Sequence, residues 1–161
     1  MNHVTDPDVE SEGHEEPVYR AEFAMGAHSA RHLRRILWLY LKGWGMPELV
    51  DAAGLALTEL IANVVRHVPG RRCQTFVFRL PGGAGIRVEV ADACPRLPVI
   101  VEADELAEDG RGLLLLDAVA DKWGVEPRPD GGGKTVWFEC LTAAGPAGGV
   151  TRTPAPPAPR P

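Results

Sequence analysis

Three polar residues lie at helical spacing in one apolar segment, residues 46–67. Glu59, Asn63 and His67 follow one another at i, i+4 and i+8, so a helix would carry them along one face. Their neighbours are mostly Leu, Ile, Val and Ala, and a carboxylate and an amide in that setting cost stability unless they have partners. A hard cation held by oxygen ligands, with a water that Glu59 orients, would satisfy both groups. The alternative is that Glu59 faces solvent and Asn63 hydrogen-bonds the backbone.

A further carboxylate stands where a predicted strand ends. Asp92 follows the strand predicted over residues 86–90, so it can project from a sheet end into a cleft. A single carboxylate there can accept a hydrogen bond from an exocyclic amine such as that of adenine. The alternative is an ordinary turn aspartate.

A Gly-x-Gly turn, residues 109–112, precedes a predicted apolar helix. Glycines at such a place let backbone N–H groups approach a phosphate, and the helix N-terminus adds partial positive charge. The segment lacks the G-x-x-x-x-G-K-[ST] layout and does not follow a strand of a βαβ unit. Neither a P-loop nor a dinucleotide-binding turn is therefore predicted, and a helix entry without a ligand is the alternative.

Apolar periodicity and turn residues predict the elements that must position these groups. An edge strand comes first, followed by two helices, a hairpin, a loop or lid, a third helix and a second hairpin. In that order the predicted elements are residues 18–25, 29–44, 46–67, 73–80 with 85–91, 93–109, 112–122, and 123–128 with 134–141. Helices and hairpins alternate without the βαβ regularity of a parallel sheet.

The 161 residues fit one domain with flexible ends, since domains cluster near roughly 100–150 residues. The folded domain is predicted over residues 17–143. Residues 1–16 carry six acids and no Lys or Arg, and residues 144–161 are rich in Pro, Ala and Gly. Both tails are predicted to be disordered.

Composition excludes several classes of protein. A net charge of -5 disfavours nucleic acid as the main partner, and no apolar run approaches the roughly 20 residues of a membrane span. The N-terminus lacks the layout of a secretory signal, so a cytoplasmic location is predicted. The three cysteines, Cys73, Cys94 and Cys140, are widely spaced without C-x-x-C, which predicts buried or incidental thiols and no zinc site.

Other polar and aromatic residues have structural interpretations. His28 and His32 lack a third ligand within reach by sequence, so they are interpreted as a polar helix face. Nearby arginines are interpreted as a solvated basic face that could receive an acidic partner. These are Arg31, Arg34 and Arg35. The four tryptophans are interpreted as core or interface packing.

In their order and spacing these features resemble the ATP-binding superfamily of gyrases, heat-shock chaperones, histidine kinases and MutL. The closest resemblance is to its small bacterial branch, the anti-sigma-factor serine/threonine kinases, and it covers about residues 20–141. LALTELIANVVRHV resembles the N box of that branch, VEVADACPRLP its adenine-aspartate box, DGRGLLLLDAVADKWGVEP its glycine box and GGGKTVWFE its last strand.

The resemblance implies an α+β fold, a two-layer sandwich of the Bergerat type with a mixed, mainly antiparallel sheet covered on one face by helices. It implies ATP and Mg²⁺ as ligands. In the implied site Glu59 is the general base, Asn63 the magnesium ligand and Asp92 the acceptor of the adenine amine. Gly110, Arg111, Gly112 and Leu113 belong to the phosphate-binding box, and Thr135 lies beneath the adenine through a water.

The implied function is that of a serine/threonine protein kinase. Its substrate would be an anti-sigma-factor antagonist of the STAS type, and in the absence of that antagonist the chain would sequester a sigma factor. The resemblance allows a homodimer, and implies no direct contact with nucleic acid or membrane. The alternative is a nucleotide-gated binding module without phosphoryl transfer. A histidine-kinase fragment is disfavoured because no phosphoacceptor helix pair precedes the domain.

Overall fold

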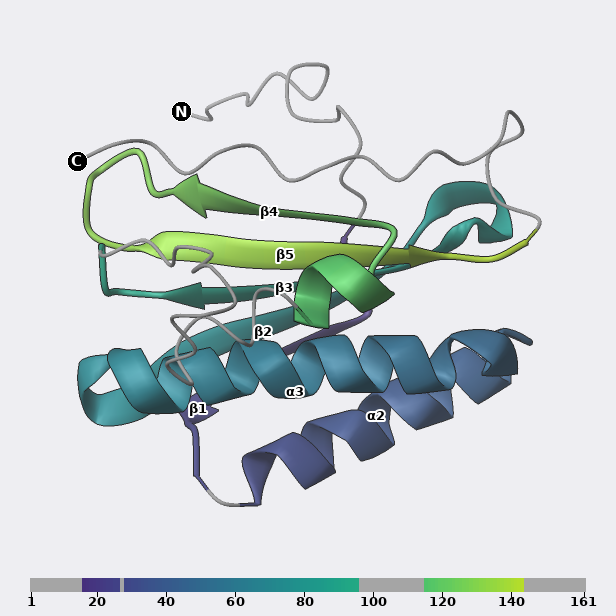
Figure 1. The fold of residues 1–161 in the computed structure, drawn as a ribbon, viewed down its shortest axis with the longest axis horizontal. Coiled ribbons are helices and arrows are strands. Elements are labelled where there is room, and N and C mark those ends of the chain that lie inside the picture. Colours follow the sequence, from purple (N-terminus) through teal and green to yellow (C-terminus); the bar gives the residue numbers. More distant parts are fainter. Residues whose placement is uncertain (1–15, 27, 96–114, 144–161) are drawn as a thin grey trace, which may run out of the picture.

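A five-stranded antiparallel sheet forms one layer of the fold. The computed structural model describes residues 16–26, 28–95 and 115–143. Its strands are β1 (Tyr19–Ala24), β2 (Arg72–Arg79), β3 (Gly85–Asp92), β4 (Lys122–Pro127) and β5 (Lys134–Leu141). They lie in the order β1-β2-β3-β5-β4, and every neighbouring pair is antiparallel, as Figure 1 shows. The predicted α+β class is confirmed, with β1 at an edge.

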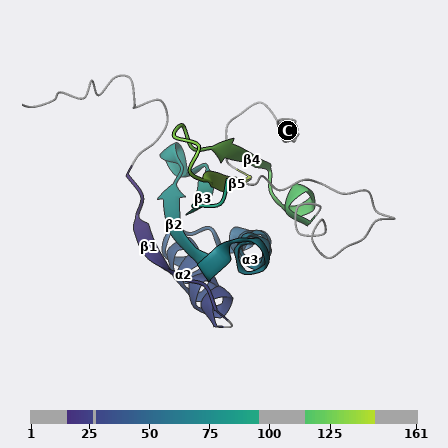
Figure 2. The same cartoon turned by 90° about the vertical axis from the view of Figure 1, so that its left-hand side faces the viewer.

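Two helices form the second layer. Helices α2 (Ser29–Gly43) and α3 (Val50–His67) cover one face of the sheet, and the edge-on view in Figure 2 shows both on the same side. The helix α3 contacts β3, β5 and α2. None of the helices in the described ranges is long and apolar enough to cross a membrane.

Alternation along the strands builds the core against these helices. In β3 the side chains of Ile86, Val88 and Val90 are at most 1% exposed, and the residues between them are half-buried. A strand with this period of two buries one face. Across the core, α2 contributes Leu33 and Leu41, and burying such a side chain stabilises the fold by roughly 1.5–3 kcal/mol.

The turn between the two helices has a specific hydrogen-bond pattern. The N–H of Gly45 donates to the carbonyl of Lys42, and the N–H of Met46 donates to that of Leu41. Gly45 has a φ of 76°, a conformation that glycine adopts without steric cost. A single 3₁₀ turn, Pro47–Leu49, follows and leads into α3. The predicted ends of both helices agree with the structure within a few residues.

The prediction of a third helix over residues 112–122 is wrong at its C-terminal end. In the described part of that segment, only residues 115–119 are helical, and Lys122 already belongs to β4. The reason is that Asp121 is attached to β5: its N–H donates to the Glu139 carbonyl, and its carboxylate accepts the Leu141 N–H. The tails, the predicted lid and the start of this helix lie outside the described residues.

The pairing of β3 with β5 requires glycine at position 133. A Cβ atom added to Gly133 would lie 2.1 Å from the backbone oxygen of Asp92 and 2.9 Å from the Ala93 Cα. We therefore expect Gly133→Ala to lower the free energy of unfolding by about 1–3 kcal/mol, because backbone must move to admit the methyl group. Urea unfolding followed by circular dichroism measures this.

Gly43→Ala is the matched control. A Cβ atom at Gly43, the last residue of α2, would meet nothing within 4 Å. We expect this variant to be as stable as the wild type or slightly more stable, because alanine favours helix. Equal stability of the two variants would contradict the close approach of β3 and β5 at Gly133.

Candidate functional site

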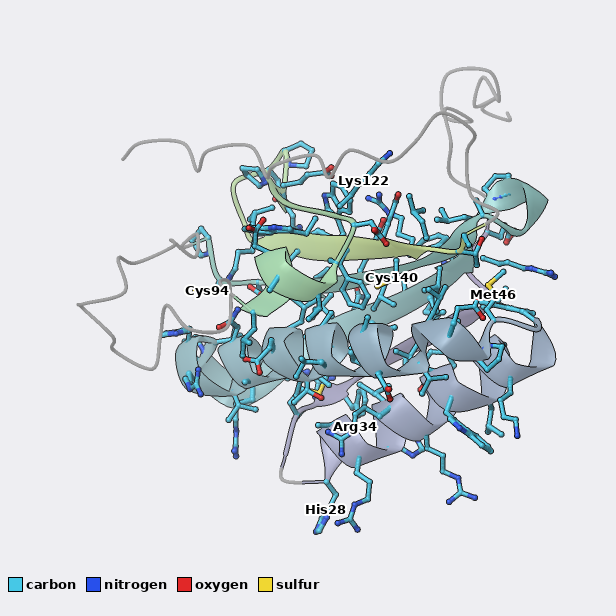
Figure 3. The ribbon with its side chains drawn as sticks, turned by 45° about the vertical axis from the view of Figure 1, so that its right-hand side comes forward. His28, Arg34, Met46, Cys94, Lys122 and Cys140 are labelled. Carbon is cyan, nitrogen blue, oxygen red and sulfur yellow. The ribbon has the colours of Figure 1, made fainter. Side chains whose placement is uncertain are left out.

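The topology brings the C-terminal end of α3 to the sheet end at which β3 finishes. α3 ends at His67, and the chain turns through residues 69–71 directly into β2. At the start of β2, Cys73 is paired with Asp92, the last residue of β3. Figure 3 shows Cys94 at this end of the molecule, and Met46, just ahead of α3, at the opposite end. Asn63 and Asp92, distant in sequence, therefore belong to one end of the domain.

Asn63 is one of three residues with a buried side-chain atom that has no hydrogen-bond partner among the described residues, and the other two, Thr75 and Trp137, are not among the predicted site residues. In Asn63 this atom is Nδ2. A buried polar group left unpaired costs about 1–3 kcal/mol, which is why such groups usually have partners. The Nδ2 atom therefore does not form the backbone hydrogen bond that the alternative interpretation of Asn63 requires. An amide can offer its oxygen to a hard cation and its N–H groups to water or phosphate oxygen, so this residue fits a nucleotide with Mg²⁺.

Glu59 lies one turn before Asn63 on α3 and is half-buried. No described residue forms an ion pair with it. A half-buried carboxylate can accept a proton while staying accessible to a substrate. His67, half-buried at the last position of α3, completes the predicted row. No group of three or more His, Cys, Asp or Glu in the described ranges is placed to hold a metal ion.

Asp92 is both a turn aspartate and one partner of a buried ion pair. Its Oδ1 accepts the Cys94 N–H at 2.8 Å, as the turn alternative predicts, and also lies 3.0 Å from the Lys134 Nζ. The side chains are 2% exposed for Asp92 and 7% for Lys134. Removing one partner of such a pair typically costs about 3–5 kcal/mol, because the other charge stays buried alone.

Lys134 is the residue at this site that the sequence prediction missed. Lys134 pairs with Asp92 in the β3–β5 register, and its side chain shares the buried face with Val136 and Phe138. Thr135 pairs with Ala91, so its side chain lies on the opposite face of the sheet. The structure therefore brings Lys134 to Asp92, and the role of Thr135 beneath the adenine, through a water, stays a prediction. The sequence does contain a signal for Lys134. Phe138, Val136 and Lys134 occupy alternate positions of β5, so the period of two places Lys134 on the buried face.

The phosphate-binding box lies outside the described residues. This applies to Gly110, Arg111, Gly112 and Leu113, and to the acidic loop before them. Their predicted contacts with phosphate stay predictions. The described part of the segment that follows contributes Leu116 and Ala120 to the core, so the chain returns to the helix-covered side of the sheet directly after the box.

The three cysteines differ in burial, which determines their reactivity. Cys73 and Cys140 are buried and Cys94 is half-buried, and all three are free thiols. Burial raises the pKa of the Cys73 thiol to about 11 and that of the Cys140 thiol to about 12. Both thiols are thus protonated, and weakly nucleophilic, near neutral pH.

We expect alkylation at pH 8 to modify Cys94 first. A pKa raised from 9.0 to about 11 lowers the thiolate fraction of Cys73 by about a hundredfold, and burial of Cys73 and Cys140 restricts access further. Iodoacetamide followed by mass spectrometry should show one early adduct, at Cys94. The Cys94→Ser variant is the control and should stay unmodified over the same period. Rapid labelling of Cys73 or Cys140 in the folded protein would contradict their burial.

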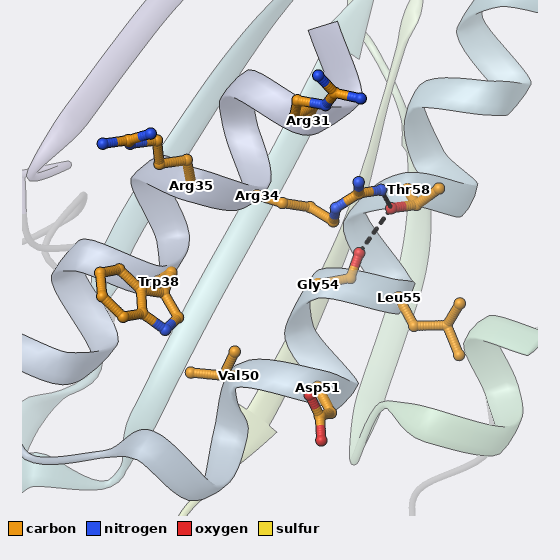
Figure 4. Close-up of a pocket in the computed structure, with 9 residues that line it drawn as sticks. All are labelled: Arg31, Arg34, Arg35, Trp38, Val50, Asp51, Gly54, Leu55 and Thr58. Atoms are coloured by element: carbon orange, nitrogen blue, oxygen red, sulfur yellow. Dashed lines mark hydrogen bonds between the residues drawn. The ribbon is translucent and has the colours of Figure 1, made fainter. Parts of the chain in front are cut away.

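A groove of about 630 Å³ lies elsewhere, between α2 and the N-terminal half of α3. Figure 4 shows Arg31, Arg35 and Trp38 along α2, with Arg35 pointing away from α3, while Asp51 and Leu55 line the groove from α3. Arg34 crosses the gap, and its Nη1 donates to the Thr58 Oγ1 at 3.0 Å, which joins the two helices. The groove extends along α3 as far as Thr58, the residue before Glu59, and its lining does not include Glu59, Asn63 or Asp92.

The fold and a match to a family model together define an α+β domain of the histidine kinase-like ATPase type. Residues 25–140 match the family model described as histidine kinase-like ATPase domain, and the chain belongs to this family. Domains of this family bind ATP, typically with Mg²⁺. The chain is also similar to an uncharacterized protein of Streptomyces coelicolor, with 39% identity over 107 residues, which are 65% of this chain and 97% of the relative.

Proposed function

We propose that this chain is an ATP-dependent serine/threonine protein kinase that regulates transcription. Its substrate is an anti-sigma-factor antagonist of the STAS type, and when free of that antagonist the chain sequesters a sigma factor. With these partners we also propose a cytoplasmic location. Family membership supports the nucleotide-binding part, and the resemblance of the motifs to the anti-sigma branch supports the kinase and its partners.

The observation that carries the proposal is the buried Nδ2 atom of Asn63, which has no hydrogen-bond partner among the described residues. It lies one turn from a half-buried carboxylate, Glu59, on a helix whose C-terminal end lies at the same end of the domain as Asp92. Besides phosphate contacts, phosphoryl transfer needs a metal ligand and a base. An acceptor for the adenine amine would hold the nucleotide in place. We assign these roles to Asn63, Glu59 and Asp92, respectively.

In the proposed reaction Glu59 accepts the proton of a substrate serine or threonine hydroxyl. The hydroxyl oxygen forms a bond to the γ-phosphorus while the bond between that phosphorus and the bridging oxygen of ADP breaks. The products are the phosphorylated side chain, ADP and the proton held on Glu59. A magnesium ion held by Asn63 neutralises phosphate charge when bound.

Glu59→Gln tests catalysis separately from binding. The glutamine keeps the shape of the side chain but cannot accept the proton, so we expect phosphoryl transfer to fall by about a hundredfold or more. ATP affinity, measured by calorimetry, should change by less than about threefold, because Glu59 is assigned no contact with the nucleotide. Transfer of labelled phosphate to candidate antagonist proteins measures the rate.

Glu48→Gln is the matched control, because Glu48 is exposed in the 3₁₀ turn before α3. Its transfer rate should equal that of the wild type. ATP binding by a wild-type protein that phosphorylates no candidate antagonist would favour the nucleotide-gated binding module instead. Unchanged transfer in Glu59→Gln would remove Glu59 from the role of base.

For the sigma factor we propose the basic groove between α2 and α3 as the contact surface. Arg31 and Arg35 are exposed there, and Trp38 is 43% exposed, so charge and an aromatic side chain are available together. Exposed arginine and tryptophan side chains often contribute most to binding at interfaces. An acidic surface of the partner would complement this groove, as the sequence suggested.

The double variant Arg31→Glu/Arg35→Glu should weaken sigma-factor binding by about tenfold or more. ATP affinity should be unchanged, because the lining of the groove does not include Asp92. Arg20→Glu/Lys122→Glu, which reverses two exposed charges on the other face of the sheet, is the control for net charge. Equal weakening by both double variants, measured by surface plasmon resonance, would contradict a specific contact at the groove.

A further inference from the structure

The ion pair between Asp92 and Lys134 leaves specific hydrogen-bonding capacity at the end of the sheet. Lys134 Nζ lies 3.0 Å from Asp92 Oδ1 and 3.1 Å from the Cys94 carbonyl oxygen. An ammonium group has three donors, so two are used by described residues and one is left. Both hydrogen bonds that described residues give the Asp92 carboxylate end on Oδ1. Oδ2 is therefore the oxygen that remains for a ligand.

The backbone holds this pair in place from several directions. Asp92 and Lys134 are directly opposite each other in the β3–β5 ladder, and Gly133 lets the two strands approach closely. The Cys94 N–H fixes the carboxylate, and the Cys94 carbonyl fixes the ammonium. A donor and an acceptor that are adjacent, buried and fixed can discriminate between ligand edges, since a mismatched ligand leaves a buried group unpaired.

The edge of adenine offers the complementary pattern. Its exocyclic amine is a donor, and the neighbouring ring nitrogen N1 is an acceptor, whereas guanine presents an acceptor and a donor in the reverse order. We propose that Lys134 donates to N1 of the adenine ring while Asp92 accepts the amine, so that the ion pair as a unit determines the choice of base. This inference rests on the proposed ATP site and adds Lys134 to it as a specificity-determining residue.

A buried ion pair is not explained by stability alone. Replacing such a pair with apolar residues of similar volume is often neutral or stabilising, because both charges must be removed from water. Apolar pairs fill the other inward positions of the same two strands, such as Val88 with Phe138 and Val90 with Val136. Along the inward face of β3 and β5, the pairs are apolar except for Asp92 with Lys134. That pair contains the carboxylate that we assign to adenine recognition.

The direct experiment uses the unaltered protein and three nucleotides. Calorimetry with Mg²⁺ compares ATP, its 1-deaza analogue, in which N1 is replaced by C–H, and purine riboside triphosphate, which lacks the amine. We expect each analogue to bind about tenfold or more weaker than ATP, because each leaves one member of the ion pair without its partner. GTP should bind weaker than either analogue.

Lys134→Met tests whether Lys134 is the group that senses N1. Methionine keeps much of the length and removes the donors, so ATP and 1-deaza-ATP should bind this variant with nearly equal affinity. The loss for purine riboside triphosphate should persist, because Asp92 is still present. Lys122→Met, an exposed lysine on β4, is the matched control and should keep the wild-type discrimination. Circular dichroism establishes that each variant is folded.

The outcomes separate this inference from the function on which it rests. No binding of ATP by the wild type would contradict the proposed function itself. Tight ATP binding with equal affinity for 1-deaza-ATP would leave that function standing and overturn the role of Lys134, which would then be purely structural. Tighter ATP binding by Lys134→Met would also overturn the proposed role of Lys134. That result would mean that Lys134 competes with adenine for Asp92.

Discussion

The close antiparallel pairing of β3 with β5 is the constraint on which the candidate site depends. Gly133 permits an approach that a Cβ atom would prevent, and the next residue of β5, Lys134, then lies opposite Asp92. Because the side chains of strands alternate, this register directs both charges to the helix-covered face. The ion pair and the hydrogen bonds of Cys94 to both of its members follow from that one register.

The helix layer supplies the other half of the site through packing. Apolar residues of α3 contact the sheet and α2, which fixes the rotation of the helix. Once that rotation is fixed, the face of α3 that carries Glu59 and Asn63 is fixed as well. The Nδ2 atom of Asn63 is then buried without a described hydrogen-bond partner. The fold thus maintains an unsatisfied polar group, which is the energetic signature expected of a site that a ligand completes.

The sequence predicted most elements because their signals are local. The bounds of β5 are those predicted from its apolar alternation, and Gly45 ends α2 as its turn conformation requires. Position 122 was assigned to the wrong element because the hydrogen bonds of Asp121 to β5 are long-range contacts. Lys134 was missed for a similar reason, since its place opposite Asp92 depends on the pairing of two strands that are far apart in the sequence. The unpartnered nitrogen of Asn63 follows from three-dimensional packing, and no pattern in the sequence reports it.

Calorimetric titration of ATP into wild type and Asn63→Ala, with and without Mg²⁺, tests the central claim that this end of the domain binds ATP with magnesium. We predict that the wild type binds ATP more tightly with Mg²⁺ than without it. In Asn63→Ala the affinity with Mg²⁺ should fall by about tenfold or more, toward the value measured without the ion. Binding of ATP with Mg²⁺ by Asn63→Ala as tightly as by the wild type would contradict the account.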